Sequence, residues 1–301
     1  MASGSKKVIY AALIGNALIS ITKFIAASVT GSSAMLSEGI HSLVDTGNQV
    51  LLLFGLRQAQ KPADAAFPFG HGKEIYFWSF IVSILIFALG SGISIYEGIH
   101  HILHPVEISS PTINYIVLSL AIIFEGAALF YAAREFNKSR GTVPALQAVR
   151  DGKDPTLFVV LFEDSAAMLG LFVALIGITL AQITGIAIFD GIASVTIGLI
   201  LGGTAIWLAK ETKGLLIGES ADPIITASIK AMLENHISIN KAHEILTLHM
   251  GPEFILVTIS ADFKDDVTAG EMEKDIAVLV REIKIKHPMV KRVFIEAEEA
   301  K

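Results

Sequence analysis

The apolar residues of this chain fall into six long stretches, which are followed by a polar tail. Each stretch is roughly 20 residues long, the length of an α-helix that crosses a ~30 Å hydrocarbon core. The six predicted spans are 8–29, 34–56, 75–99, 113–133, 157–182 and 187–208. We expect the first stretch to be a span rather than a removable signal peptide, because it is too long and no small-residue cleavage site precedes a soluble domain.

The basic residues are confined to one set of connecting loops. Twelve Lys or Arg side chains lie before span one, between spans two and three, between spans four and five, and after span six, and the other three loops have none. They are Lys6, Lys7, Arg57, Lys61, Lys73, Arg134, Lys138, Arg140, Arg150, Lys153, Lys210 and Lys213. Because cytoplasmic loops are enriched in Lys and Arg, we expect both termini in the cytoplasm.

Residues 211–301 show the patterns of a small α+β domain. The predicted elements are a helix at 222–236, strands at 242–249 and 254–263, a helix at 268–285 and a strand at 290–297. Asp222 with Pro223 is typical of a helix start, and Thr268 with Glu271 matches a capping box. The order αββαβ predicts an antiparallel sheet with helices on one face.

Composition supports this division into a transmembrane domain, 1–210, and a cytoplasmic domain, 211–301. The whole chain of 301 residues is 52% hydrophobic and 17% charged, whereas soluble proteins average about 25% charged. Only 25 of the first 210 residues are charged, against 27 of the last 91. The absence of cysteine excludes disulfides and thiolate metal sites. The net charge of −6 argues against a nucleic-acid partner.

Ionisable residues inside the spans are the candidate functional residues, because each costs ~2.5–3.5 kcal/mol to insert. Span two places Glu38, His41 and Asp45 on one helical face. The other carboxylates are Glu125 in span four and Glu163 and Asp164 in span five. One imidazole with carboxylates and no thiol favours zinc, then manganese, iron, cobalt or nickel. Calcium and magnesium prefer oxygen ligands alone.

The same residues also fit structural roles. Intramembrane His and Asp side chains can join helices or face a water-filled cavity, and Glu38 and Glu125 could support the ligands or relay protons. We expect Lys23 and Glu97 to extend toward the headgroups, and Asp190 to cap the start of its own helix. The outer end of span three carries a second candidate cluster, consisting of His100, His101 and His104 near Glu107.

Several stretches together resemble the cation diffusion facilitator family, in particular the branch typified by zinc transporter nine. They are GSSAMLSE at 31–38, HSLVD at 41–45, NQVLLLFGLR at 48–57, FGHGK at 69–73, EGA at 125–127 and LFEDSAA at 161–167. The resemblance covers the whole chain. It implies six transmembrane helices and a ferredoxin-like, metallochaperone-like cytoplasmic α+β domain.

The resemblance also implies a transport site made by two residues four apart on span two and two on span five. Here these positions hold His41, Asp45 and Asp164, while the fourth position holds Val160. The fourth ligand would then come from Glu163, Glu38, Glu125 or water.

Two further metal sites of the family are only partly matched. At the site between spans two and three, Asp64 and His71 fit the pattern, but Phe67 stands in the other His position. In the tail, His243 matches one ligand, and the remaining ligand positions hold Thr258, Glu271, Glu296 and Glu298. We therefore expect a weak or absent loop site, and either a carboxylate-rich tail site or a solvated acidic edge.

The resemblance implies a homodimer that exports divalent cations, zinc first, in exchange for protons by alternating access. Metal ligands must be deprotonated, so metal and protons compete for the same groups. We expect a multi-pass protein of a bacterial plasma membrane, with an organelle membrane as the alternative. A membrane metal sensor that does not transport is a second hypothesis. A hydrolase is disfavoured, because no His-Glu-x-x-His or Gly-x-Ser-x-Gly motif occurs.

Overall fold

The computed structural model describes residues 3–141, 144, 148 and 155–299, which form two compact units. The helical unit contains the segments Met1–Leu56, Phe77–Arg150 and Pro155–Thr212. The second unit contains the loop Arg57–Tyr76 together with Lys213–Lys301. Arg150 and Lys153, two of the basic loop residues counted above, lie outside the described residues.

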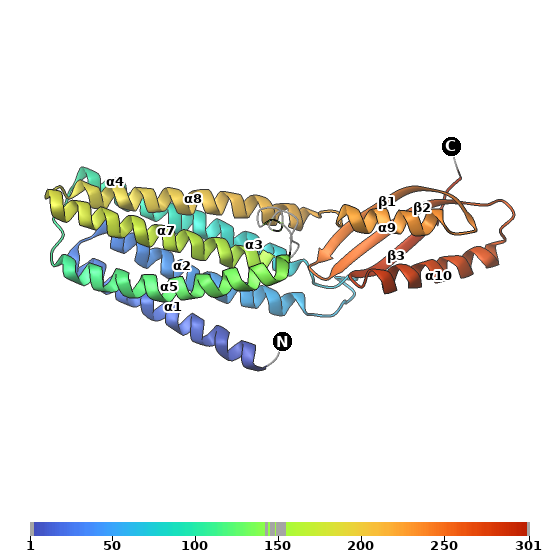
Figure 1. Ribbon diagram of the computed structural model, residues 1–301, viewed down its shortest axis with the longest axis horizontal. Coiled ribbons are helices and arrows are strands. Elements are labelled where there is room, and N and C mark those ends of the chain that lie inside the picture. Colours follow the sequence, from blue (N-terminus) through green and yellow to red (C-terminus); the bar gives the residue numbers. More distant parts are fainter. Residues whose placement is uncertain (1–2, 142–143, 145–147, 149–154, 300–301) are drawn as a thin grey trace. The chain divides into compact units, whose positions relative to one another are not determined.

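The helical unit is a bundle of long helices that lie side by side (Figure 1). The helices are α1 (Ser3–Thr30), α2 (Ser33–Ala59), α3 (Glu74–Leu85), α4 (Gly92–Leu103), α5 (Pro111–Arg140), α7 (Pro155–Thr184) and α8 (Ile188–Ile217). Helix α5 packs along α7 and also against α1. Helix α8 continues well past residue 208, where the hydrophobic pattern predicted its end.

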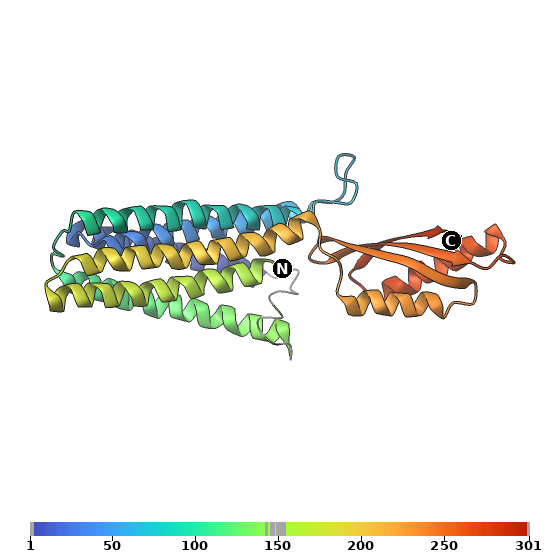
Figure 2. The ribbon, with the colours of Figure 1, turned by 90° about the horizontal axis from the view of Figure 1, so that it is seen from above.

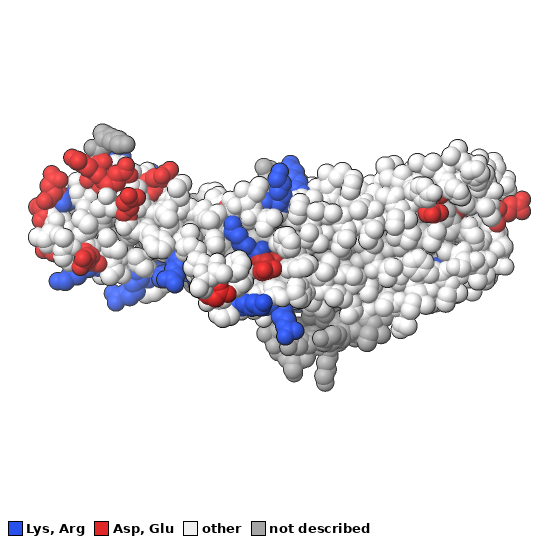
Figure 3. All heavy atoms as spheres, turned by 180° about the vertical axis from the view of Figure 1, so that it is seen from behind, with Lys and Arg blue, Asp and Glu red and all other residues white. Residues whose placement is uncertain are grey.

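Four helical segments among the described residues are long and apolar enough to cross a membrane, namely Glu74–Leu103, Pro111–Lys138, Phe158–Thr184 and Ile188–Ile217. They correspond to the predicted spans three to six. Helix α1 adds a shorter apolar stretch, Asn16–Thr30. On the face shown in Figure 3, the helical unit presents few charged side chains between its ends, and many large apolar side chains of this unit are exposed.

The third predicted span is not a uniform α-helix. A π-helical segment, η1 (Ile86–Ser91), lies between α3 and α4. The hydrogen bonds of such a segment span five residues instead of four, so the helix face that follows it is rotated. Beyond it, α4 lies close to α8, since a Cβ atom on Gly98 would stand 2.6 Å from the backbone nitrogen of Val195.

The C-terminal unit is a three-stranded sheet with two helices on one face (Figure 2). Its elements are α9 (Pro223–Glu234), β1 (Ile239–Gly251), β2 (Phe254–Phe263), α10 (Ala269–Lys286) and β3 (Val290–Ala297). Apolar side chains of both helices and all three strands form one core. The two predicted helix starts are confirmed: Asp222 accepts a hydrogen bond from the Ile224 amide, and Thr268 and Glu271 form a capping box.

The prediction of a fully antiparallel sheet is wrong. Strands β1 and β2 are antiparallel, whereas β2 and β3 are parallel. The physical reason is the connection: α10 runs back along the sheet after β2, so the chain re-enters the sheet in the direction of β2. A strand–helix–strand crossover of this kind joins parallel strands.

Candidate metal site between the membrane helices

Helix α2 turns a run of polar side chains toward the interior of the helical unit. Glu38, His41 and Asn48 are buried, and Asp45 exposes 13% of its side chain. These residues follow one another at intervals of three or four, which places them along one face of the helix. Burying so many polar groups is costly unless they find partners or hold an ion.

His41 and Asp45 supply two ligand atoms at a spacing close to that of two zinc ligands. Nδ1 of His41 lies 3.2 Å from Oδ1 of Asp45. Both atoms are buried, and within the described part of the chain neither has a hydrogen-bond partner. Two ligands of a tetrahedral zinc ion, each about 2.0–2.2 Å from the metal, stand about 3.4 Å apart.

Glu163 of α7 joins this pair. It is buried, and its Oε1 accepts a hydrogen bond of 2.5 Å from Nδ2 of Asn48. Its carboxyl group is also within hydrogen-bonding reach of the Asp45 carboxyl group. Two carboxyl groups within hydrogen-bonding reach of each other share a proton or a cation, because two adjacent negative charges in a low-dielectric site repel each other strongly.

Asp164, the α7 residue that the family pattern favours, is half-buried, and it lies within electrostatic range of Asp45. Val160, one turn earlier, supplies no ligand atom. Glu163 and Asp164 are neighbours on a helix and so point about 100° apart. Of these two acids, Glu163 is the one that is hydrogen-bonded to the polar face of α2, through Asn48, although the sequence pattern favoured Asp164.

Among the residues that the structure describes, no three His, Asp or Glu side chains already stand at the spacing of a bound metal ion. The six candidate residues form two neighbouring groups instead. His41, Asp45, Glu163 and Asp164 make up the first group.

Glu38 and Glu125 belong to a second group, which is centred on Lys23 of α1. Both carboxylates form ion pairs with Nζ of this lysine. The expectation that Lys23 extends to the headgroups is wrong, because this side chain is fully buried.

Asp190 does not cap its own helix, contrary to the sequence prediction. Its buried carboxylate accepts hydrogen bonds from the backbone amides of Ser33 and Ala34, at 2.5 and 3.3 Å, so it caps α2. His101 lies 3.7 Å from the same carboxylate and is buried, whereas His100 is exposed and its ring stands 5.0 Å from that of His104. The three histidines therefore do not converge on one metal site.

Asp64 and His71 meet in the loop after α2. Nε2 of His71 lies 3.0 Å from Oδ2 of Asp64. The hydrogen bond from His71 lowers the pKa of the exposed Asp64 carboxyl group, and the Phe67 amide adds to the shift. The Phe67 ring lies beside the His71 ring, with centroids 4.5 Å apart. Phe67 brings no ligand atom, so the loop offers two ligands rather than three.

The tail residues do not form one metal site either. Glu296 and Glu298 line a hollow of about 280 Å³ on the sheet, together with Glu244 and Thr258, but His243 is not part of its lining. His243 lies between Ala242 and Glu244, where the strand pairing is irregular. Glu271 is held by its capping box, and its pKa is lowered by the Thr268 backbone amide.

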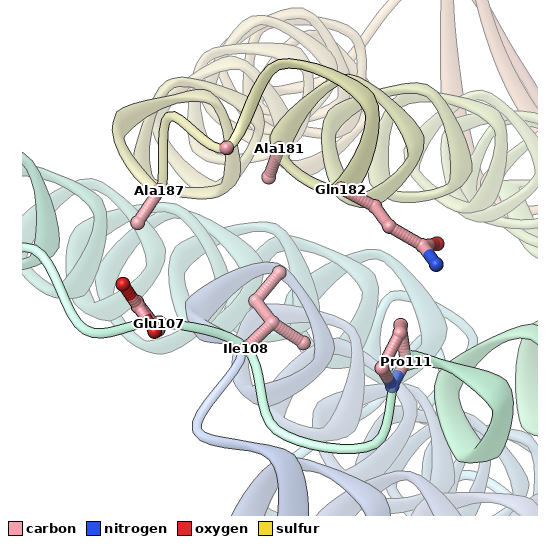
Figure 4. Close-up of a pocket in the computed structure, with 7 residues that line it drawn as sticks. Glu107, Ile108, Pro111, Ala181, Gln182 and Ala187 are labelled. Carbon is pink, nitrogen blue, oxygen red and sulfur yellow. The ribbon is translucent and has the colours of Figure 1, made fainter.

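A further hollow, of about 260 Å³, lies between the loop after α4 and the turn that joins α7 to α8. Its lining is mainly apolar apart from Glu107 and Gln182, which Figure 4 shows on opposite sides of the hollow. Divalent metals in proteins require several converging ligands. This hollow is therefore not a metal site.

Comparison with known proteins identifies the family of the chain. The cation efflux transmembrane domain matches residues 9–217. The chain is 34% identical over 285 residues to the mitochondrial proton-coupled zinc antiporter SLC30A9 of Xenopus laevis, covering 93% of this chain and 51% of that protein. It is 32% identical over 297 residues to the human protein of the same name, covering 97% and 52%.

A further relative is the manganese efflux system protein MneP of Bacillus subtilis. It is 26% identical over 305 residues, covering 98% of this chain and 94% of that protein. The chain spans about half the length of the zinc antiporters it matches. The domain match covers most of the chain and all of the helices that hold the polar groups. The chain therefore belongs to the cation efflux family, as an integral multi-pass membrane protein of a transporter family and not an enzyme.

Proposed function

We propose that the chain is a secondary transporter that exports divalent metal ions, zinc first, in exchange for protons by alternating access. The observation that carries the proposal is the buried His41–Asp45 pair, whose facing atoms lie 3.2 Å apart and lack hydrogen-bond partners among the described residues. Glu163 and Asp164 stand beside the pair on α7 and could complete the ligand set. The names of the relatives, a zinc antiporter and a manganese efflux protein, support a divalent cargo.

The exchange follows from competition for the same atoms. A zinc ion requires the imidazole to be neutral and the carboxylates to be ionised, so a bound ion displaces protons. Without the ion, the neighbouring carboxyl groups of Asp45 and Glu163 need a shared proton instead. Loading on the side with fewer protons and release on the more acidic side then couple the two fluxes.

We also propose that all six predicted spans cross the membrane, with both termini in the cytoplasm. Helices α1 and α2 have 28 and 27 residues, about 40 Å at 1.5 Å per residue, which exceeds a ~30 Å core. The polar residues that lower the hydropathy of α2 face the interior rather than lipid. Residues 211–301 then form the cytoplasmic domain. We further propose a homodimer, in a bacterial plasma membrane or an organelle.

Zinc uptake into proteoliposomes with an imposed pH gradient tests the function. His41→Ala, Asp45→Asn and Asp164→Asn should each abolish exchange, while Glu97→Gln, away from the candidate site, should leave it unchanged. Each of the first three variants removes a ligand or a charge that balances Zn²⁺, which weakens binding by about 3–5 kcal/mol. Exchange at the wild-type rate in Asp45→Asn would refute the site.

The second candidate function is a metal sensor that does not transport. Val160 favours it, because the family pattern has a ligand at this position. A sensor would bind zinc through His41 and Asp45 but would move none across the membrane. Zinc binding without uptake by the wild-type protein would therefore favour the sensor.

A further inference from the structure

Lys23 holds three partners inside the helical unit. Its Nζ lies 3.0 Å from Oε2 of Glu38, 2.8 Å from Oγ of Ser42 and 2.7 Å from Oε1 of Glu125. The partners come from α2 and α5, so one ammonium group connects three helices. A lysine ammonium has three N–H donors, and here each has an oxygen to bind.

Each of the two carboxylates contacts Lys23 through only one of its two oxygen atoms. Oε1 of Glu38 and Oε2 of Glu125 are buried, and within the described residues neither has a hydrogen-bond partner. Oε1 of Glu38 points at Gly170 of α7, where a Cβ atom would collide with it. The group thus consists of oxygen atoms alone, arranged around a positive charge.

Oxygen-only sites of this kind suit hard divalent cations. Manganese, magnesium and calcium favour carboxylate, hydroxyl and water ligands, whereas zinc accepts imidazole readily. If Lys23 were absent, Glu38, Ser42 and Glu125 would offer two negative charges and up to five oxygens to such a cation. The group also lies beside the proposed transport site, because Glu38 and Ser42 flank His41 on α2.

We infer that Lys23 is a specificity-determining residue. Its ammonium occupies the position of a cation between Glu38 and Glu125, and so withholds these two carboxylates from divalent metal ions. The cargo is thereby confined to the group that contains His41. The inference deepens the proposed function, but its test measures bound metal rather than transport, so the two can fail separately.

The test compares wild type with Lys23→Met, which keeps an unbranched side chain and removes the charge. Each full-length protein is purified in detergent, saturated with zinc, dialysed against manganese, and analysed for both metals. Lys23→Met should hold about one additional manganese per chain relative to wild type, bound by oxygen ligands. Lys213→Met, at an exposed position of α8, should hold no more manganese than wild type.

The double variant Lys23→Met, Glu38→Gln shows whether the added manganese uses this group. It should lose the additional manganese, because one of the two carboxylates is gone. If a folded Lys23→Met protein binds no more manganese than wild type, the inference is wrong. The inference is equally wrong if the double variant keeps the additional ion.

A second measurement applies even if Lys23→Met does not fold. Glu38→Gln with Lys23 in place should bind the same number of zinc ions as wild type, with an unchanged zinc X-ray absorption spectrum, since Glu38 is withheld from the metal. A changed zinc ligand shell or a lost zinc ion in this variant would make Glu38 a ligand and overturn the inference.

Discussion

Asp190 joins α8 to the first turn of α2, and its replacement should destabilise the helical unit. Its carboxylate is fully buried and accepts four hydrogen bonds from α2 and the residue before it. The donors are the hydroxyl groups of Ser32 and Ser33, at 2.6 and 2.9 Å, and two backbone amides. These amides belong to the start of α2, where an anion is favoured by the helix dipole.

The cost of Asp190→Asn can be worked out from these contacts. An asparagine keeps one acceptor oxygen and replaces the other by an NH₂ group, which faces donors. At least one amide or hydroxyl then loses its partner, at a cost of about 1–3 kcal/mol. The lost charge at the helix start adds up to about 1–2 kcal/mol. The neutral asparagine avoids the desolvation penalty of a buried charge, which offsets part of this sum. We therefore expect the free energy of unfolding to fall by about 3 kcal/mol.

Tryptophan fluorescence during denaturant unfolding in detergent measures this loss, because both tryptophans of the chain, Trp78 and Trp207, lie in the helical unit. Glu107→Gln is the matched control. Glu107 is an exposed acid of the loop after α4, and its replacement should change stability by less than about 0.5 kcal/mol. If Asp190→Asn unfolds at the same denaturant concentration as wild type, the capping role of Asp190 is refuted.

Three further predictions concern the site and the tail. Glu163→Gln should lose zinc–proton exchange as completely as Asp45→Asn, because it removes the carboxyl group that meets Asp45; retained exchange would leave Asp164 as the only α7 ligand. The Asp45→Asn protein lacks the proposed transport site, so calorimetry on it measures zinc binding by the tail. This binding should be micromolar or weaker, because His243 is not part of the hollow that Glu296 lines. Nanomolar binding would contradict this expectation. The Thr268 backbone amide lowers the pKa of Glu271. The ionised Glu271 side chain therefore stabilises α10 at pH values above the pKa that Glu271 has in the unfolded chain. This stabilisation disappears as the pH falls through the lower pKa of Glu271 in the folded protein. Glu271→Gln should therefore speed hydrogen exchange of α10 at pH 7, with a difference from wild type that narrows in acid, and a pH-independent difference would contradict the assignment.

Local patterns were enough to predict much of this fold. Hydropathy located the helices because each buries its own backbone polar groups and needs only length and apolar side chains to span a membrane. The capping residues at Asp222 and Thr268 were equally readable, since a cap involves side chains a few residues from the amides they bind. The direction of β3 was not readable in this way, because it depends on how α10 packs across the sheet.

The partners of the buried ionisable residues could not be predicted from local patterns. Lys23 is bonded to Glu125, which lies 102 residues further along the chain, and Asp190 caps residues 157 and 156 positions before it. A snorkelling lysine and a buried, paired lysine look alike in one span. Which of the two acids, Glu163 or Asp164, faces α2 depends on how α7 is rotated about its own axis. The sequence did contain a hint for Glu163. Helix α2 carries Asn48 one turn beyond Asp45, and its side-chain amide can donate a hydrogen bond to a carboxylate on a neighbouring helix.

Zinc X-ray absorption on the full chain, loaded with one equivalent of zinc, shows whether His41 binds the metal ion. We predict a ligand shell of nitrogen and oxygen atoms at about 2.0–2.2 Å from the zinc ion, with one imidazole. His41→Ala should remove the imidazole contribution, and His243→Ala should leave the spectrum unchanged. An unchanged spectrum in His41→Ala, or an imidazole signal lost in His243→Ala, would place the ion away from His41 and refute the proposed transport site.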